Sequence, residues 1–138
     1  MNVQDIAIMF TEDFSNRAFR TNARNYVDPN ISVYDSGTGM QLQGLDAYLA
    51  YCEGWIAALP DARAEIVDAH ADGNHVTLTI RGSGNFTGEM ATPDGTIPGN
   101  GSRLDMDFEQ EFEIRNGKVV KFALNYDMQE FLRQLGLA

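Results

Sequence analysis

Cysteine and positive charge are what this sequence has least of. Its 138 residues include one cysteine, Cys52, so no disulfide can form within the chain. Lysine and arginine number 10 against 20 aspartates and glutamates, which gives a net charge of −10. An acidic surface repels the phosphates of nucleic acids and of anionic membranes, so we expect neither as a partner.

Long apolar runs are absent as well. No stretch approaches the ~18 residues of a membrane-spanning helix, so we expect no membrane span. The opening residues MNVQDIAIMF have no basic segment, and Gln4 and Asp5 interrupt their apolar stretch. A secretory signal has a different pattern, and we therefore expect a cytoplasmic protein. The length fits one domain, which we place at residues 1–138.

Helical periodicity marks the first part of the chain. Apolar side chains recur at intervals of three and four over residues 3–14, about 16–27 and 45–59. Pro60-Asp61 ends the last of these stretches. We therefore predict three helices.

Strand patterns dominate the rest. ARAEIVDAHA and NHVTLTIRGSGNF are separated by Asp72-Gly73, which is typical of a hairpin. KVVKFALNYD forms a final strand, and MQEFLRQLGL follows it as a C-terminal cap. Residues 88–102 are rich in glycine and proline, and we expect a long hairpin connection or a lid there. The order of the elements predicts an α+β fold, a strongly curved mixed or antiparallel sheet with about three helices enclosing a cone-shaped cavity.

Residues 103–114 alternate most strictly, with an apolar face that contains Gln110 and a second face of acidic residues. The acidic residues are Asp105, Asp107, Glu109, Glu111 and Glu113. Residues on one face of a strand repeat every ~6.6 Å, which is too far apart for oxygens that bind Ca²⁺ at about 2.5 Å. His70 and His75 make no ligand set with carboxylates, so we expect no metal site.

Two long segments resemble a known family. WIAALPDARAEIVDAHADGNHVTLTIRGSGNFTGEM is similar to the middle of SnoaL-like polyketide cyclases, in which an apolar helix ends in a Pro-Asp pair and a hairpin runs into a Gly-x3-Gly element. GKVVKFALNYDMQEFLRQLGL is similar to that family's ending, a Tyr-Asp pair followed by an RQLG motif. The resemblance implies the nuclear-transport-factor-2-like cone, a hydrophobic small-molecule ligand, no cofactor and a homodimer.

The resemblance also implies two catalytic carboxylates. Asp127, at the end of the last strand, would project into the cavity, where burial raises the pKa of a carboxyl and suits it to proton transfer. Asp35 lies in YVDPNISVYDSGTG, similar to the element that carries the base of ketosteroid isomerases. The alternatives from the residues alone are a helix N-cap at Asp127 and a turn-opening Asp35. Residues 3–14 contain no tyrosine, which those isomerases require on their first helix.

Expected ligand contacts surround these acids. Gln110 is the one polar residue on its apolar strand face, so it either holds a ligand carbonyl or bonds a neighbouring group. The other expected contacts are Asn85, Trp55, Tyr51, Asn125 and Phe108.

The sequence departs from the family pattern at two places. The Gly-x3-Gly element has no histidine, and no His-Trp pair precedes Asp127. We therefore expect either a cofactor-free cyclase or isomerase that moves a proton on an enolisable carbonyl compound, or a non-catalytic small-molecule-binding or assembly domain of the same fold.

Overall fold

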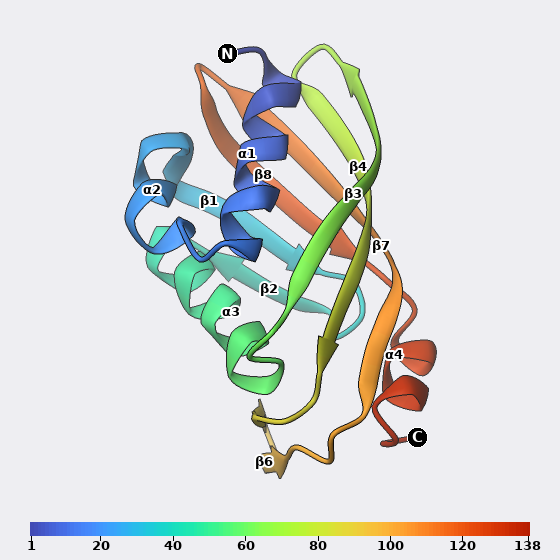
Figure 1. Ribbon diagram of the computed structural model, residues 1–138. Helices are drawn as coiled ribbons and strands as arrows, with labels where there is room; N and C mark the ends of the chain where they lie inside the picture. Colours follow the sequence, from blue (N-terminus) through green and yellow to red (C-terminus); the bar gives the residue numbers. More distant parts are fainter.

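Four helices and eight strands make up the computed structural model, which describes residues 1–138 (Figure 1). The helices are α1 (Val3–Ser15), α2 (Phe19–Tyr26), α3 (Leu45–Ala58) and α4 (Met128–Gln134). The strands are β1 (Val27–Asp35), β2 (Met40–Gln43), β3 (Arg63–Asp72), β4 (His75–Asn85), β5 (Glu89–Thr92), β6 (Gly95–Pro98), β7 (Arg103–Arg115) and β8 (Lys118–Asn125). The three predicted helices are confirmed, and α4 forms within the C-terminal cap.

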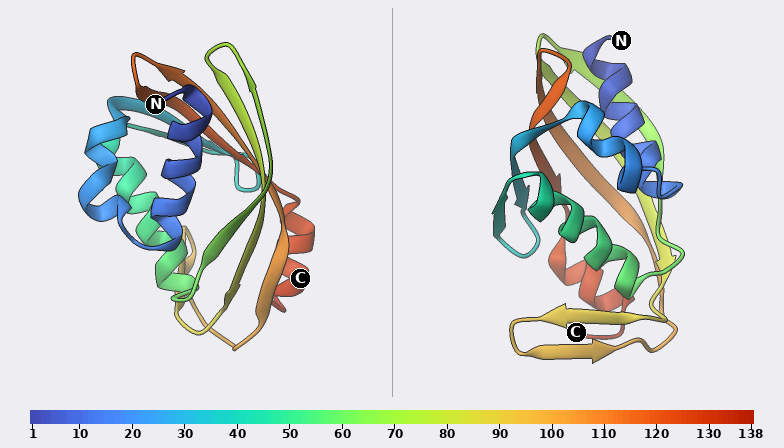
Figure 2. Two further views of the ribbon diagram at one scale, coloured as in Figure 1. Left: turned by 45° about the horizontal axis from the view of Figure 1, so that its top comes forward. Right: turned by 90° about the vertical axis from the view of Figure 1, so that its left-hand side faces the viewer.

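One six-stranded sheet carries the fold, with the strand order β2-β1-β8-β7-β4-β3. β1 pairs in parallel with β8, and all other neighbours are antiparallel. The long strands bend, and α1, α2 and α3 lie on one side of the sheet while α4 lies beyond β7 (Figure 2). The predicted α+β class and the curved mixed sheet are confirmed. No helix has the length and apolar character needed to cross a membrane.

Buried and exposed side chains alternate along β7, and the buried ones define the inner face of the sheet. Its inward side chains are buried and its outward ones are mostly exposed, as the sequence predicts. The inward set is Leu104, Met106, Phe108, Gln110, Phe112 and Ile114. On the outer face Arg81 of β4 binds Asp105 at 2.7 Å and Asp107 at 3.0 Å, so two members of the acidic ladder are paired. The turn from β7 to β8 uses Asn116 and Gly117 with φ of 52° and 76°, the left-handed geometry of a tight hairpin.

Arg17 holds the helical layer against the end of α3. It is a non-glycine residue with φ of 69°, and it follows directly on the end of α1. Its guanidinium donates to the carbonyl oxygens of Phe14 at 2.9 Å, Ser15 at 3.1 Å, Ala62 at 2.9 Å and Pro60 at 2.9 Å. These bonds tie the α1–α2 corner to the α3–β3 connection and offset the backbone strain at Arg17.

The glycine- and proline-rich segment 88–102 contains a two-stranded hairpin, β5 and β6, as predicted. Figure 2 (right) shows it lying across one end of the molecule, below α3. Gly88 N donates to the Ala58 carbonyl at 3.1 Å, and Gly99 N donates to the Gly88 carbonyl at 2.7 Å. The base of the hairpin is therefore fixed to the C-terminal end of α3.

We predict that Gly88→Ala destabilises the protein by about 2 kcal/mol. A Cβ at Gly88 would overlap the carbonyl oxygen of Ala57, which is backbone and cannot rotate away. Gly54→Ala is the matched control, because a Cβ there meets nothing within 4 Å and lies inside α3. We expect it to stabilise by about 0.5–1 kcal/mol. Urea denaturation measures both, and equal midpoints would contradict the tight packing of the hairpin base.

Candidate functional site

A cavity of about 80 Å³ lies between the helices and the inner face of the sheet, and 14 of its 19 lining residues are hydrophobic. Among the lining residues are four of the expected ligand contacts: Tyr51, Trp55, Phe108 and Gln110. Pockets for drug-sized ligands measure roughly 300–1,000 Å³. The cavity in this conformation therefore suits a small chain or part of a single ring.

Two buried polar residues on the inner face of the sheet, Asp35 and Gln110, share one row of the sheet. Asp35 on β1 stands opposite Leu124 on β8, and Leu124 stands opposite Gln110 on β7. Asp35 is 3% exposed and Gln110 is 6% exposed. Because neighbouring strands lie ~4.8 Å apart, the two Cα atoms are separated by about 10 Å. The fold thus places one carboxylate and one amide in line on either side of a leucine.

Asp35 is held by neutral donors. Tyr51 Oη donates to Oδ2 at 2.7 Å, and Thr38 donates to Oδ1 through its backbone N at 3.0 Å and its hydroxyl at 3.1 Å. No lysine or arginine lies within salt-bridge distance of the carboxylate. Asp35 therefore opens the turn after β1, the alternative that the residues alone allowed, and its other oxygen is bonded by Tyr51 of α3. Tyr51 separates it from the cavity, because Tyr51 is a lining residue and Asp35 is not.

Tyr51 stays protonated in this setting. Burial raises the pKa of its phenol far above the ordinary value, and the adjacent Asp35 charge raises it further. Tyr126 has a raised pKa for the same two reasons, in the same order. Both phenols can donate and accept hydrogen bonds, but neither carries negative charge near neutral pH.

Gln110 has one bonded end and one open end. The Thr11 hydroxyl of α1 donates to Oε1 at 2.7 Å. The amide nitrogen Nε2 has no hydrogen-bond partner in the protein. Every fully buried side-chain N or O atom does have a partner, so Nε2 is not fully buried. Because Gln110 lines the cavity, we infer that Nε2 is open to it. The interpretation that Gln110 bonds a neighbouring group is confirmed for its oxygen. The interpretation that it holds a ligand carbonyl stays a prediction, for which the nitrogen has the free position.

Aromatic side chains enclose the space next to this row. Trp55 of α3 contacts Tyr51, Phe108 and Tyr126 with ring centroids 6.0–6.4 Å apart. Phe108 lies 5.1 Å from Tyr126. The rings meet edge-on or tilted, the favourable arrangement for aromatic pairs. Trp55 and Phe108 thus form part of the apolar wall of the cavity.

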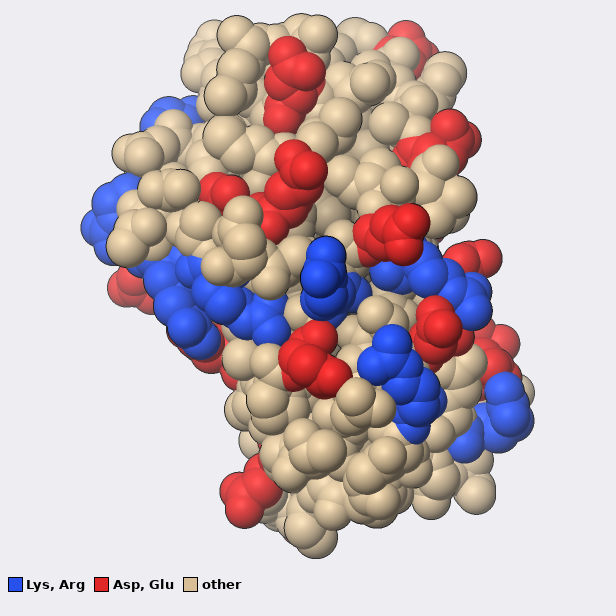
Figure 3. Space-filling model, in the orientation of Figure 1, with Lys and Arg blue, Asp and Glu red and all other residues tan.

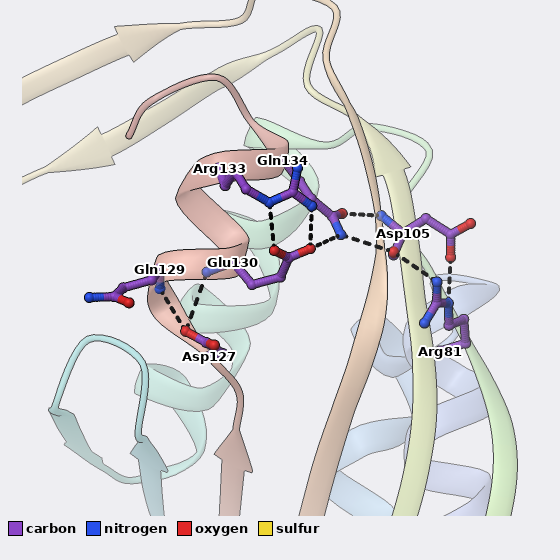
Figure 4. Close-up of polar contacts among 7 residues, drawn as sticks. All are labelled: Arg81, Asp105, Asp127, Gln129, Glu130, Arg133 and Gln134. Carbon is purple, nitrogen blue, oxygen red and sulfur yellow. Dashed lines mark hydrogen bonds and ion pairs between the residues drawn. The ribbon is translucent and has the colours of Figure 1, made fainter.

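Asp127 lies outside the cavity, which corrects its expected placement. It is exposed, and its Oδ1 accepts from the backbone N of Gln129 at 2.9 Å and of Glu130 at 3.3 Å (Figure 4). Asp127 is therefore the N-cap of α4, the alternative that the residues alone allowed. The physical reason is that its strand phase follows Asn125, and the first turn of α4 supplies free N–H groups that attract the carboxylate.

Asn125 and Asn85 also lie away from the cavity, contrary to expectation. Asn125 Nδ2 donates to Glu111 at 3.1 Å on the outer face of β7. Asn85 binds the Asp61 carboxylate through its backbone N and its Nδ2, both at 2.7 Å. Neither amide lines the cavity.

Thr11 is the site residue that the sequence reasoning missed. It is 1% exposed, and it is a polar residue on the apolar side of α1, four positions after Ala7 and one after Phe10. The sequence signal for this site was that Thr11 and Gln110 are polar residues on otherwise apolar faces. The sequence does not show that the two residues bond each other, because this depends on the contact between α1 and β7 in the fold.

Arg63 is the one charged residue among those that line the cavity. Figure 3 shows Lys and Arg in a band across the middle of one face, with acidic side chains above and below. No group of three or more His, Cys, Asp or Glu side chains is placed to hold a metal ion. Cys52 lines the cavity, and burial raises the pKa of its thiol to about 12.

The family model of the SnoaL-like polyketide cyclases matches residues 5–135. The chain belongs to this family. No curated protein sequence matches it.

Solved structures share the fold at low sequence identity. A proposed SnoaL-like polyketide cyclase from Jannaschia sp. CCS1 has a TM-score of 0.87 at 13% identity, covering 99% of this chain and 92% of that one. IdmH, a proposed polyketide cyclase from Streptomyces antibioticus, has a TM-score of 0.81 at 20% identity, covering 99% of both chains. AclR, a proposed hydroxylase from Streptomyces galilaeus, has a TM-score of 0.79 at 20% identity, covering 99% of this chain and 85% of that one. Because the activities proposed for these proteins differ while the fold is shared, the fold alone does not assign the reaction.

We predict that Asp127→Ala in this SnoaL-like protein lowers the free energy of unfolding by about 1 kcal/mol, because it removes the cap of α4. Asp127→Ser keeps a capping oxygen and is expected to retain most of the stability. Urea denaturation measures the difference. An Asp127→Ala protein with the same free energy of unfolding as the wild type would show that the cap contributes nothing to stability.

Alkaline titration should show that four of the five tyrosines ionise only with unfolding. Their folded pKa values are all raised above 10.0, with burial as the first cause. The unfolded chain then releases protons that the folded protein keeps, so stability is intact below about pH 10 and falls as pH rises above it. Tyrosinate absorbance and circular dichroism, recorded together, test this. Ionisation of these tyrosines before unfolding would contradict it.

Proposed function

We propose that this protein catalyses cofactor-free proton transfer on a small, largely apolar, enolisable carbonyl compound, in a cyclisation or isomerisation. The observation that supports this most is the polar row of the sheet. It offers an open amide N–H at Gln110 and, across Leu124, a carboxylate that reaches the cavity through Tyr51. The rest of the wall is mainly apolar, and such a wall strengthens both polar contacts.

In this proposal Gln110 binds the substrate oxygen. Its Nε2 donates a hydrogen bond to the carbonyl and strengthens that bond when negative charge develops on the oxygen. Thr11 holds the other end of the amide, so the donor is oriented before the substrate arrives.

Asp35 is the proton acceptor, and Tyr51 conducts the proton. The phenol oxygen takes the proton from the carbon next to the carbonyl while the phenol passes its own proton to Oδ2 of Asp35. The products are a neutral Tyr51, a protonated Asp35 and an enolate held by Gln110. Returning the proton to a different carbon gives an isomer. If the enolate first attacks a second carbonyl of the same molecule, the returned proton neutralises the new alkoxide and a ring is closed.

The raised pKa of Tyr51 fits a role as a proton relay, in which the phenol does not become a phenolate intermediate. A phenolate there is disfavoured by burial and by Asp35. Both protons therefore move together, and the charge rests on Asp35 before the transfer and on the substrate oxygen after it.

Binding without turnover is the second candidate. It is favoured by the contacts of Asp35, whose two oxygens are already occupied by Tyr51 and Thr38 and do not line the cavity. In that case Gln110 would hold a ligand carbonyl and no proton would move.

Deuterium exchange separates the two candidates. We would follow the protons beside the carbonyl of 2-butanone in D₂O by NMR, with wild-type protein, Asp35→Asn, Tyr51→Phe and Asp127→Asn. General-base removal is expected to slow the catalysed exchange by a factor of roughly 10²–10⁴ in the first two variants. Asp127→Asn is the matched control, because it removes a carboxylate outside the cavity, and its rate should equal that of the wild type.

Three other results would change the assignment. If 2-butanone binds but does not exchange with the wild type, the binding candidate stands. If Asp127→Asn stops exchange and Asp35→Asn does not, the wrong acid has been chosen. If Tyr51→Phe exchanges at the wild-type rate, Asp35 acts without Tyr51.

A further inference from the structure

The Thr11 hydroxyl has one proton and two acceptors. It lies 2.7 Å from Gln110 Oε1 and 3.1 Å from the carbonyl oxygen of Ala7, one helical turn earlier in α1. A hydroxyl donates one hydrogen bond and can accept others, so these two bonds are not made at full strength together. Thr11 is 1% exposed, so no bulk water competes for it.

Nothing else in the row fixes which way the Gln110 amide faces. Its sheet neighbours on either side are Leu124 and Leu78, which have no hydrogen-bonding side chain. Thr11 is the only side chain that bonds the amide, and the other end of the amide is open to the cavity. The orientation of the amide therefore depends on the direction in which the Thr11 hydroxyl points.

We propose that Thr11 and Gln110 form a reversible pair that presents either a hydrogen-bond donor or an acceptor to the ligand. In the first arrangement Thr11 donates to Oε1, and Nε2 faces the cavity. In the second, the amide is turned over, Thr11 donates to the Ala7 carbonyl and accepts from Nε2, and Oε1 faces the cavity. Each arrangement leaves the buried end of the amide bonded, so exchange between them loses no internal partner.

The pair can bind an enolisable compound in each of its neutral forms. A ketone oxygen, like the enolate oxygen formed from it, accepts a hydrogen bond and fits the first arrangement, whereas an enol hydroxyl donates one and fits the second. This inference rests on the proposed function for its use in the reaction. It narrows the ligands to compounds that can bind at Gln110 either as a ketone, which then becomes the enolate, or as an enol, and it makes Thr11 a positioning residue.

The test compares three probes of equal size: 2-butanone, which accepts, 2-butanol, which donates and accepts, and 2-methylbutane, which does neither. Affinities are measured by NMR titration with wild-type protein, Thr11→Val and Thr11→Ser. The side-chain N–H signals of Gln110, assigned from Gln110→Leu, report the orientation of the amide. We expect the wild type to bind the ketone and the alcohol within about threefold of each other, with different Gln110 signals in the two complexes.

The variants distinguish the effect of the Thr11 hydroxyl on the amide from the effect of Thr11 on packing. Thr11→Val has the shape of threonine without the hydroxyl, so we expect it to bind the ketone and the alcohol at least about tenfold more weakly, since the amide loses its buried partner. Thr11→Ser keeps the hydroxyl and should retain the affinities and signals of the wild type. The affinity for 2-methylbutane should be the same in all three proteins, which shows that the cavity is intact.

Two results would overturn the inference without touching the proposed function. Identical Gln110 signals in the ketone and alcohol complexes would show a fixed amide. Thr11→Val with wild-type affinities and signals would show that Thr11 does not position it. In either case deuterium exchange of 2-butanone can still proceed.

If the ketone and the alcohol both bind no better than 2-methylbutane, Gln110 recognises neither, and both proposals fail. If both bind as expected but no deuterium exchanges, the reversible pair stands and the proton-transfer function fails.

Discussion

The two buried polar side chains on the inner face of the curved sheet, Asp35 and Gln110, each have a hydrogen-bond partner in the helical layer, because their neighbour in the row between them is apolar. An unpartnered buried polar group is costly, and this constraint links the layers. Asp35 is bonded by Tyr51 of α3, and Gln110 is bonded by Thr11 of α1. The same two contacts that make the fold tolerate polar residues in its interior place a carboxylate and an amide beside one cavity. The hydrogen bonds that satisfy these buried groups are therefore the ones that the proposed function uses.

The buried carboxylate next to the cavity is therefore on the first strand rather than the last. The inward positions of β8 are Val119, Phe122 and Leu124, all apolar, while the acid at the strand's end turns outward to cap α4. Figure 4 shows how far that outer network extends, from Asp127 and Glu130 through Gln134 to Asp105 and Arg81. A family ending can thus persist for structural reasons, since an N-cap and its following ion pairs stabilise a short helix whatever happens in the cavity.

Much of the fold could be predicted because its signals are local. Alternation over residues 103–114 identified β7 and the inward direction of Gln110, and the 3.6-residue period identified α1 and α3. The site was predicted less completely. Trp55, Tyr51 and Phe108 share an apolar face with core residues, so their place on the wall followed from periodicity. Asn85 and Asn125 carry the right chemistry, but their strand phase and nearby carboxylates hold them outside.

The sequence by itself determined the main helices and strands, the buried and exposed faces of β7 and the acidic outer face of that strand, because these follow from periods of 2 and 3.6 residues and from composition. Only the tertiary structure decided that Asp35 and Gln110 share a row, since this depends on the parallel pairing of β1 with β8 and on its register. It also decided the choice between cap and catalyst at Asp127, and the partnership of Thr11 with Gln110 across 99 positions of chain. Such contacts join residues that are distant in sequence, and no local pattern encodes their distance.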